Sequence, residues 1–206
     1  MSQIVRLSLS ALLMVVASAQ TPALRKGVSV QMPVTTNAAT MPDADQADSL
    51  IVAVTFRGAI FLGATPATPA QLSEEVKADL RGSSGKKVYL KADARTPYQT
   101  VAEVLGALRT AGVDAPILLT NQHESVNTAY VPAAGLEVLP ALDAGPATAL
   151  RVGNGQPSDA EVKRRAQRDR PVVLQVDGAA PFGDVVHVVD VCRMAGAKVY
   201  LATAGK

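Results

Sequence analysis

The chain has 206 residues, of which 48% are hydrophobic and 18% are charged. This length and balance allow one large or two small globular domains and exclude wholesale disorder. Its 20 basic and 18 acidic residues leave a formal charge of +2, which is too balanced for the footprint of a nucleic-acid-binding protein. Only one cluster is locally basic, and we interpret it as the solvated face of a helix, with nucleic-acid binding as the minor alternative; it comprises Lys163, Arg164, Arg165, Arg168 and Arg170.

The N-terminal residues 1–19 have the form of a secretory signal. Arg6 precedes an apolar run over residues 7–17, and Ala17-Ser18-Ala19 fits an A-x-A cleavage site. A membrane helix needs about 20 apolar residues, and this run is shorter. We therefore expect cleavage after Ala19 and export of the rest of the chain, with retention of the segment as an uncleaved anchor as the alternative.

Residues 20–49 are rich in Pro, Thr, Ala and Asp and show little periodicity. This composition predicts a tether, which carries one short strand candidate, GVSVQMP, at residues 27–33.

A first folded unit is predicted over residues 50–120. The apolar runs 50–56 and 59–62 are separated by Arg57-Gly58 and indicate a β-hairpin. Thr68 and Gln71 form a capping box that opens a helix running through Leu80. With the elements that follow, the order is β-β-α-β-α-β, which predicts a two-layer α/β (α+β) domain with its helices on one face of the sheet.

An internal repeat organises the chain. The pattern over residues 87–120 returns over residues 171–203, and each copy reads strand, Asp turn, helix, Ala-Gly stop, strand. The equivalent residues are 84 positions apart in the sequence, as in the pairs Asp93 and Asp177, Tyr98 and Phe182, and Gly112 and Gly196. Such a fixed offset indicates a repeated structural unit.

The helix of each copy is predicted by an apolar stripe with steps of three and four residues. Pro97 and Pro181 fit the first helical position, and Thr96 with Gln99 forms a capping box in the first copy. Gly112 and Gly196 are expected to end the helices with positive φ, and the flanking runs 88–90, 117–119, 172–176 and 199–201 to form buried strands. The stripe residues are Tyr98, Val101, Val104, Leu105, Leu108 and Ala111, and Phe182, Val185, Val188, Val189, Cys192 and Ala195.

Residues 121–135 are polar and predict a linker, and residues 136–206 predict the second unit. Its hairpin is degraded: a strand at 136–139, a turn at 143–145 and a weak strand at 149–152 remain, and Pro140 and Pro146 restrict these strands to sheet edges. Ser158 with Glu161 forms the capping box of the basic helix. We expect this second unit to lean on the first.

These motifs resemble the periplasmic domain of ExbD/TolR-type proteins, a family of biopolymer transport proteins. The shared pattern is a strand ending in Asp, an aromatic residue after Pro, a helix of the form V-x-x-V-x-x-x-L/C-R-x-A-G and a closing strand ending in Thr, and GVSVQMP resembles the family's G-x-x-V-x-L-P stretch. The resemblance implies two tandem ExbD/TolR-like units, the second partial, each a small mixed sheet with two helices on one face. The residues that carry it are Gly27, Met32, Pro33, Asp93, Tyr98, Gly112, Asp177, Phe182 and Gly196.

The same resemblance implies a non-catalytic role in the cell envelope, in energy-transducing transport at the inner membrane. Its implied partners are ExbB/TolQ-like motor subunits, TonB- or TolA-like proteins, or peptidoglycan. TolR-type domains resemble dimer-forming modules, so two linked copies predict an internal pseudo-dimer and a monomeric chain.

One departure from the family concerns proton coupling. ExbD and TolR proteins carry an aspartate in a full membrane helix, whereas no Asp or Glu precedes Asp43 here. Acids inside a bilayer are costly and are kept for function, so the absence argues against a proton-carrying role. The alternatives are a membrane-anchored, divergent ExbD-type subunit, a peptidoglycan-binding periplasmic protein, or a mis-called start codon that hides a longer helix.

The search for a reaction centre yields two aspartates and one histidine. Asp93 and Asp177 stand where a turn uses Asp to bond nearby amides, and a general-acid role is the alternative. His187 is expected on a helix surface near Asp184 and Asp190, and a metal site would need further ligands. We therefore predict no enzyme activity and no cofactor.

Three further residues allow both a structural interpretation and a functional one. Cys192 lies in the apolar stripe and is expected to be a buried small hydrophobe, with an intermolecular disulfide as the alternative. Arg109 and Arg193 are expected at exposed, equivalent positions that favour a helix C-terminus. Contact with an acidic partner or peptidoglycan is the alternative for this arginine pair.

Overall fold

The computed structural model describes residues 28–46, 48–81, 85–122, 133–140, 147–153, 157–166 and 170–202. The expected signal or anchor segment, Gly27, the turn at 143–145, Pro146 and Arg168 lie outside these residues. No helix in the described part of the chain is long and apolar enough to cross a membrane.

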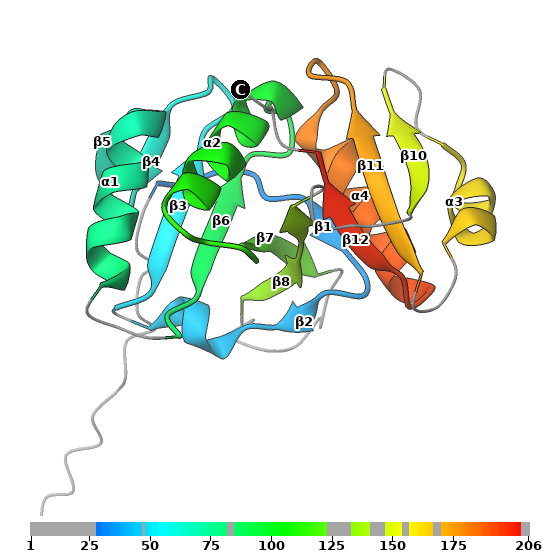
Figure 1. The fold of residues 1–206 in the computed structure, drawn as a ribbon, viewed down its shortest axis with the longest axis horizontal. Helices are drawn as coiled ribbons and strands as arrows, with labels where there is room; N and C mark the ends of the chain where they lie inside the picture. Colours follow the sequence, from blue (N-terminus) through cyan, green and yellow to red (C-terminus); the bar gives the residue numbers. More distant parts are fainter. Residues whose placement is uncertain are drawn as a thin grey trace, which may run out of the picture.

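The protein is built from two β-sheets that lie side by side, each with helices packed on it (Figure 1). The first sheet has the order β2-β8-β7-β6-β3-β4-β5, with β1 also paired to β7, and the second has the order β10-β11-β12-β9. This is the mixed α/β architecture expected from the sequence. The strands are β1 (Val34–Thr35), β2 (Ala39–Thr40), β3 (Leu50–Val54), β4 (Ile60–Leu62), β5 (Thr65–Ala67), β6 (Val88–Ala92), β7 (Ile117–Gln122), β8 (Ala134–Glu137), β9 (Leu139–Pro140), β10 (Thr148–Val152), β11 (Pro171–Val176) and β12 (Lys198–Leu201). The helices are η1 (Pro42–Asp45), α1 (Pro69–Leu80), α2 (Tyr98–Thr110), α3 (Asp159–Arg165) and α4 (Phe182–Met194).

The predicted hairpin and first helix are confirmed. β3 and β4 pair antiparallel, and Thr68 caps α1 through a complete capping box with Gln71. The structure adds β5, which pairs with β4. Pro66 lies in β5 and cannot donate to a further strand, which suits an edge position.

Each sheet contains three parallel strands linked by the predicted helices. β3 pairs with β6 and β6 with β7 in the first sheet, and β10 pairs with β11 and β11 with β12 in the second. All five residues of β6 are buried, because the strand has neighbours on both sides and side chains packed on both faces. In Figure 1, α2 lies in front of its sheet and α4 lies behind the second sheet.

Two predictions about the helix starts are wrong. α2 and α4 begin at Tyr98 and Phe182, so Pro97 and Pro181 occupy the N-cap position instead of the first helical position. The predicted capping box of Thr96 and Gln99 does not form, because the Thr96 hydroxyl donates to the Thr55 carbonyl instead. The predicted helix ends are confirmed, since Gly112 and Gly196 have φ of 91° and 78°.

The chain returns to the first sheet before it enters the second. Asn121 and Gln122, at the start of the expected linker, extend β7, and Ala134 and Gly135 at its end belong to β8, which pairs antiparallel with β7. The prediction that Leu136 and Glu137 open a strand of the second unit is wrong, because both residues belong to β8 of the first sheet. β9 then pairs parallel with β12 of the second sheet. One short segment thus contributes a strand to each sheet.

The N-terminal segment packs against the first sheet on the face opposite α1 and α2. Met32 and Ala44 are buried there in a cluster with Ile51, Tyr89 and Ile117. Residues 28–46 of the expected tether therefore contribute to the core.

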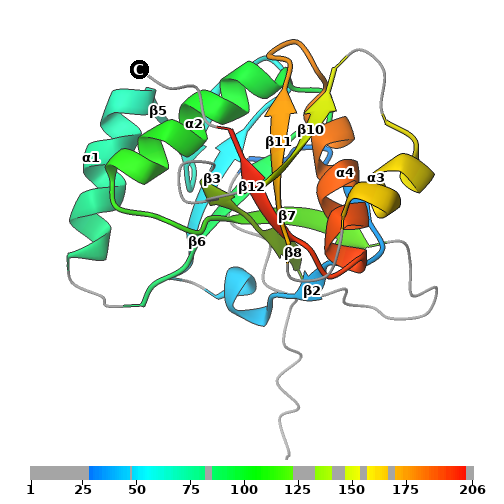
Figure 2. The same cartoon turned by 45° about the vertical axis from the view of Figure 1, so that its right-hand side comes forward.

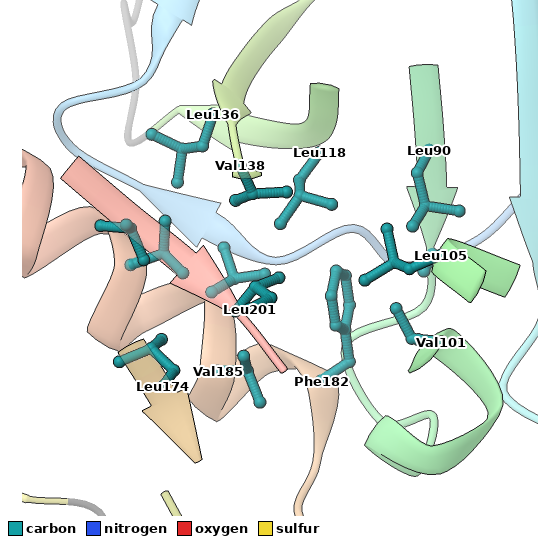
Figure 3. Packing of buried hydrophobic residues seen from close by; sticks show 14 of the residues in the cluster. Leu90, Val101, Leu105, Leu118, Leu136, Val138, Leu174, Phe182, Val185 and Leu201 are labelled. Carbon is teal, nitrogen blue, oxygen red and sulfur yellow. The ribbon is translucent and has the colours of Figure 1, made fainter. Parts of the chain in front are cut away.

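A single apolar cluster joins the two halves of the molecule. Figure 3 shows the Phe182 ring beside Val101 and Leu105 of α2, with Leu201 of β12 on its other side. Burial of this apolar surface, at about 25 cal/mol per Å², is the main force that holds the two sheets together.

Candidate functional site

The starts of α2 and α4 meet in a reciprocal contact, which we name the helix-entry junction (residues 94–99 and 178–183). The Tyr98 amide donates to the Ala180 carbonyl and the Phe182 amide donates to the Thr96 carbonyl, each at 2.8 Å. A second pair repeats the relation: the Gln99 amide donates to Gly178 at 2.9 Å and the Gly183 amide to Ala94 at 2.8 Å.

This junction explains why neither helix has a side-chain cap. The first amides of a helix have no acceptor within the helix and need one from elsewhere. Pro97 and Pro181 offer no capping side chain, and they lie opposite one another in an antiparallel bridge. Each helix is capped by carbonyls of the other loop, so the two helix starts depend on each other.

The two aromatic residues reach across the junction. The Tyr98 hydroxyl donates to the Ala202 carbonyl, after β12, at 2.8 Å, and burial raises the pKa of that hydroxyl. Phe182 is fully buried against α2. Each aromatic side chain therefore packs against the opposite half of the molecule.

Two glycines allow this close approach. A Cβ at Gly183 would lie 3.2 Å from both the Cβ and the carbonyl oxygen of Ala94, and a Cβ at Gly178 would lie 3.2 Å from the Cβ of Gln99. These distances are tight for carbon contacts, since favourable carbon–carbon separations are about 3.5–4.0 Å.

Asp93 ties the junction to the N-terminal segment. Its buried carboxylate accepts from the Gln31 amide at 3.1 Å and forms an ion pair with the Arg95 guanidinium at 2.8 Å. The side-chain hydrogen bond from Arg95 is the main cause that lowers the pKa of Asp93 to about 2. A carboxyl group held ionised in this way is poorly suited to donate a proton.

The turn roles predicted for the aspartates agree with the observed bonds. Asp93 accepts from the Arg95 amide at 3.1 Å, and the exposed Asp177 accepts from the Ala179 amide at 2.9 Å. The equivalence ends there, because only Asp93 is buried and paired with a cation.

Sequence reasoning missed an aromatic surface next to this aspartate. The Phe56 ring is 47% exposed, and the guanidinium carbons of Arg95 and Arg57 lie 4.9 Å and 5.5 Å from its centroid. We name Phe56, Arg57 and Arg95 the cationic aromatic surface. Phe56 ends a predicted strand. The signal in the sequence that could have indicated this surface is an aromatic residue directly before Arg-Gly.

Asp190 is a second buried aspartate with a distinct role. It was expected near His187 on the helix surface, which is wrong: it is 3% exposed. Its carboxylate accepts from the Thr36 amide at 2.9 Å, the Thr36 hydroxyl at 3.2 Å and the Asn37 amide at 3.0 Å. The N-terminal segment is therefore fixed to α4 as well as to the first sheet.

The other predicted residues are placed as follows. The partly exposed His187 contacts Asp159 of α3 at 2.9 Å, and no group of three or more potential metal ligands occurs among the described residues. Cys192 is buried as expected, and burial raises the pKa of its thiol to about 12. Arg193 is exposed, whereas Arg109 is half-buried beside Leu105, so the two arginines are not equally accessible.

The remaining motif residues support the fold. Met32 is buried on the first sheet, and the Pro33 carbonyl accepts from the Asn121 amide at 2.8 Å next to β1. Within the described residues, the junction brings the helix starts at Tyr98 and Phe182 together, and Asp93 directly precedes it. Gly112 and Gly196 lie at the far ends of their helices.

Comparison with known families gives a match to a biopolymer transport family. The sequence model of the family described as biopolymer transport protein ExbD/TolR matches residues 4–123, which is more than half of the chain. The matched part contains β1 to β7 with α1 and α2, and begins within the apolar N-terminal segment. No curated protein matches the chain.

Proposed function

Because the chain belongs to the ExbD/TolR family of biopolymer transport proteins, we propose that it is a non-catalytic periplasmic interaction module of TonB/Tol-type energy-transducing transport. In this proposal its partners are ExbB/TolQ-like motor subunits and TonB- or TolA-like proteins. Family members act in the cell envelope without catalysing a reaction, which fits the paired, ionised state of Asp93.

We further propose that residues 136–206 act as the second, partial copy of the unit and form an internal pseudo-dimer with the first. The helix-entry junction carries this proposal. Its hydrogen bonds join equivalent positions reciprocally, Tyr98 to Ala180 and Phe182 to Thr96, as a two-fold axis between two copies would require. A chain that satisfies this contact internally is expected to be a monomer.

The proposed module offers its cationic aromatic surface to the transport partners. Phe56 is exposed although it is a large apolar side chain, and aromatic and arginine residues are the types enriched in protein interfaces. The ion pair between Asp93 and Arg95 holds one of the two guanidinium groups over the ring.

Site-specific crosslinking in the native envelope tests this proposal. A photo-crosslinking residue at Phe56 is expected to capture an ExbB/TolQ-like or TonB/TolA-like protein, identified by mass spectrometry. The same residue at the exposed Ala78 of α1 is the matched control. Capture of neither class at Phe56, or the same products at both positions, would contradict the proposal.

A membrane-anchored, divergent ExbD-type subunit is the second candidate. The observation that favours it is the family match from residue 4, which includes the apolar run. Mass spectrometry of the mature N-terminus in periplasmic and membrane fractions separates the two. A start at Gln20 in the soluble fraction supports the free module, and an intact N-terminus in the membrane fraction supports the anchored subunit.

A further inference from the structure

The two sheets differ at one edge. In the first sheet, the parallel strands β3, β6 and β7 are extended by β4 and β5, which cover the outer side of β3. In the second sheet, β10 pairs with β11 as β3 pairs with β6 in the first, so β10 is the equivalent of β3. It is the outermost strand of its sheet (Figure 2). The described residues contain no strand that takes the place of β4 next to β10.

The hydrogen bonds show which groups of β10 face outward. Alternate residues of a strand direct their backbone groups to opposite sides. The Val152 carbonyl accepts from the Asp177 amide, just after β11, so the backbone groups of Val152 face inward, toward β11. The backbone groups of Ala149 and Arg151 therefore face outward. Among the described residues, the outward backbone groups of these two residues make one long hydrogen bond of 3.4 Å, which the Arg165 guanidinium donates to the Ala149 carbonyl.

The equivalent groups of β3 are used for strand pairing. The Val54 carbonyl accepts from Asp93, which places Ile51 and Ala53 outward. Ala53 pairs with Phe61 of β4, and the Ile51 carbonyl accepts from Gly63 at 2.8 Å. The first unit thus shows the geometry in which an antiparallel strand satisfies this edge.

An open groove is lined by residues of β10, of α3 and of the neighbouring strand β11. It has a volume of about 480 Å³ and is lined by Arg151, Arg165, Glu161 and Gln175, among others. Glu161 is paired with Arg165 at 2.9 Å, and Lys163 and Arg164 of the same helix and Arg170 before β11 are exposed. The described residues 151–153, 157–166 and 170 contain five basic and two acidic side chains, so this part of the chain attracts negative charge.

We propose that the edge of β10 binds an extended acidic segment of a partner protein, which adds to the second sheet as an antiparallel strand in the place that β4 takes in the first. Backbone groups of Ala149 and Arg151 supply the main-chain hydrogen bonds, and the basic side chains select acidic residues. A second copy fits less well, because pairing two β10 edges would bring two sets of arginines together.

This inference names the class of partner for the proposed module and relies on the proposed function only for its cellular setting. A binding assay with the purified full chain keeps the two questions separate. The probe is a fluorescent peptide of about eight residues with alternating valine and glutamate, followed by anisotropy. If crosslinking at Phe56 fails, the result of this binding assay is unaffected. If the peptide does not bind, the crosslinking result is likewise unaffected.

The decisive variant is Ala149→Pro, which removes an outward amide and retains every charge. We expect its affinity for the peptide to fall about tenfold or more, whereas Ala149→Ser, which keeps the amide, binds like the wild type. Unchanged binding by a folded Ala149→Pro protein would overturn the proposal. Equal competition by an oligothymidylate would also overturn it, because charge alone would then explain binding.

Amide exchange in the wild type tests the same contact without a substitution. Addition of the peptide is expected to slow exchange at Ala149 and Arg151 and to leave the inward-facing Leu150 unchanged. No slowing at these two amides under saturating peptide would contradict strand addition.

A charge variant tests the chemistry of the partner. Replacing Arg151 and Arg164 by Gln is expected to weaken binding several-fold, with a smaller salt dependence, while Lys77→Gln with Arg81→Gln on α1 is the matched control. A valine–lysine peptide that binds equally well would overturn the acidic assignment. Light scattering that shows a dimer of the wild type and a monomer of the Ala149→Pro variant would also overturn the proposal, because the edge would then bind a second copy of the chain.

Discussion

Tyr98 and Phe182 each start a helix, and each donates its amide at 2.8 Å to a carbonyl two residues before the other, Ala180 and Thr96. Their side chains also pack across the same contact, with the Tyr98 hydroxyl bonded to Ala202 and the Phe182 ring beside α2. The two halves of the molecule are therefore coupled through both backbone and core.

Phe182→Ala is expected to destabilise the whole protein. The ring is fully buried between the two halves, and removal of a buried Phe costs about 3–5 kcal/mol. Denaturant unfolding measures the loss, and Phe182→Leu is the control that keeps most of the apolar volume. A loss below about 1 kcal/mol for the alanine variant would contradict the central role given to this contact.

Gly183→Val is expected to strain the junction. The new Cβ would lie 3.2 Å from Ala94, and forced packing of this kind costs about 1–3 kcal/mol. Thermal unfolding measures the effect, with Gly153→Ala as the control, because a Cβ there would lie 3.9 Å from the Cβ of Asp177, an ordinary contact distance. Equal melting temperatures for the two variants would show that the halves separate more easily than the hydrogen bonds imply.

Asp190→Asn is expected to loosen the N-terminal segment. The carboxylate is buried and accepts three hydrogen bonds from Thr36 and Asn37. The amide of Asn keeps one acceptor oxygen and turns its N–H group toward the donors that faced the other oxygen. Loss of hydrogen bonds to a buried charge costs about 1.5–3 kcal/mol. Hydrogen exchange should accelerate at Thr36 and Asn37, and the exposed Glu103→Gln is the control; unchanged exchange would refute the contact's importance.

Acid should weaken the protein through Asp93. Its pKa is lowered from an ordinary value of 3.8 to about 2, mainly by Arg95. The folded state therefore binds the proton less well than the unfolded state, so the stabilisation is present above about pH 4 and is lost as pH falls toward about 2. Unfolding experiments over this pH range should show that the free energy of unfolding falls more steeply for the wild type than for Asp93→Asn.

Arg95→Ala provides the matched test of that cause. Without the guanidinium, the pKa of Asp93 is expected to rise toward its ordinary value, so the loss of stability between about pH 4 and pH 2 should become shallower than in the wild type. The Asp177→Asn variant, at the equivalent but exposed position, should keep the wild-type acid profile. An Arg95→Ala profile identical to the wild type would show that the ion pair does not hold the carboxylate ionised.

Cys192 should be unreactive in the folded protein. Burial raises the pKa of its thiol to about 12, and the thiolate is the reactive form. Labelling by iodoacetamide at pH 8 is expected only after unfolding. Rapid labelling of the native chain, or a disulfide-linked dimer under oxidising conditions, would contradict this and support the intermolecular alternative.

Local sequence patterns determined most of the individual elements. The apolar stripe set the buried faces of α2 and α4, the Thr68–Gln71 box set the start of α1, and Gly112 and Gly196 set the helix ends. These features depend on residues within one or two turns of each other. A periodic pattern or a capping side chain can therefore be recognised without knowing what lies opposite.

The tertiary structure alone decided how the two halves meet. Thr96 and Gln99 have the sequence of a cap, yet carbonyls about 80 residues away satisfy the helix. Asp190 has the spacing of a surface residue, yet Thr36 and Asn37 bury it. Backbone carbonyls carry no sequence signature, and the donors that accompany a buried charge come from distant segments, so only the folded chain shows which groups become partners.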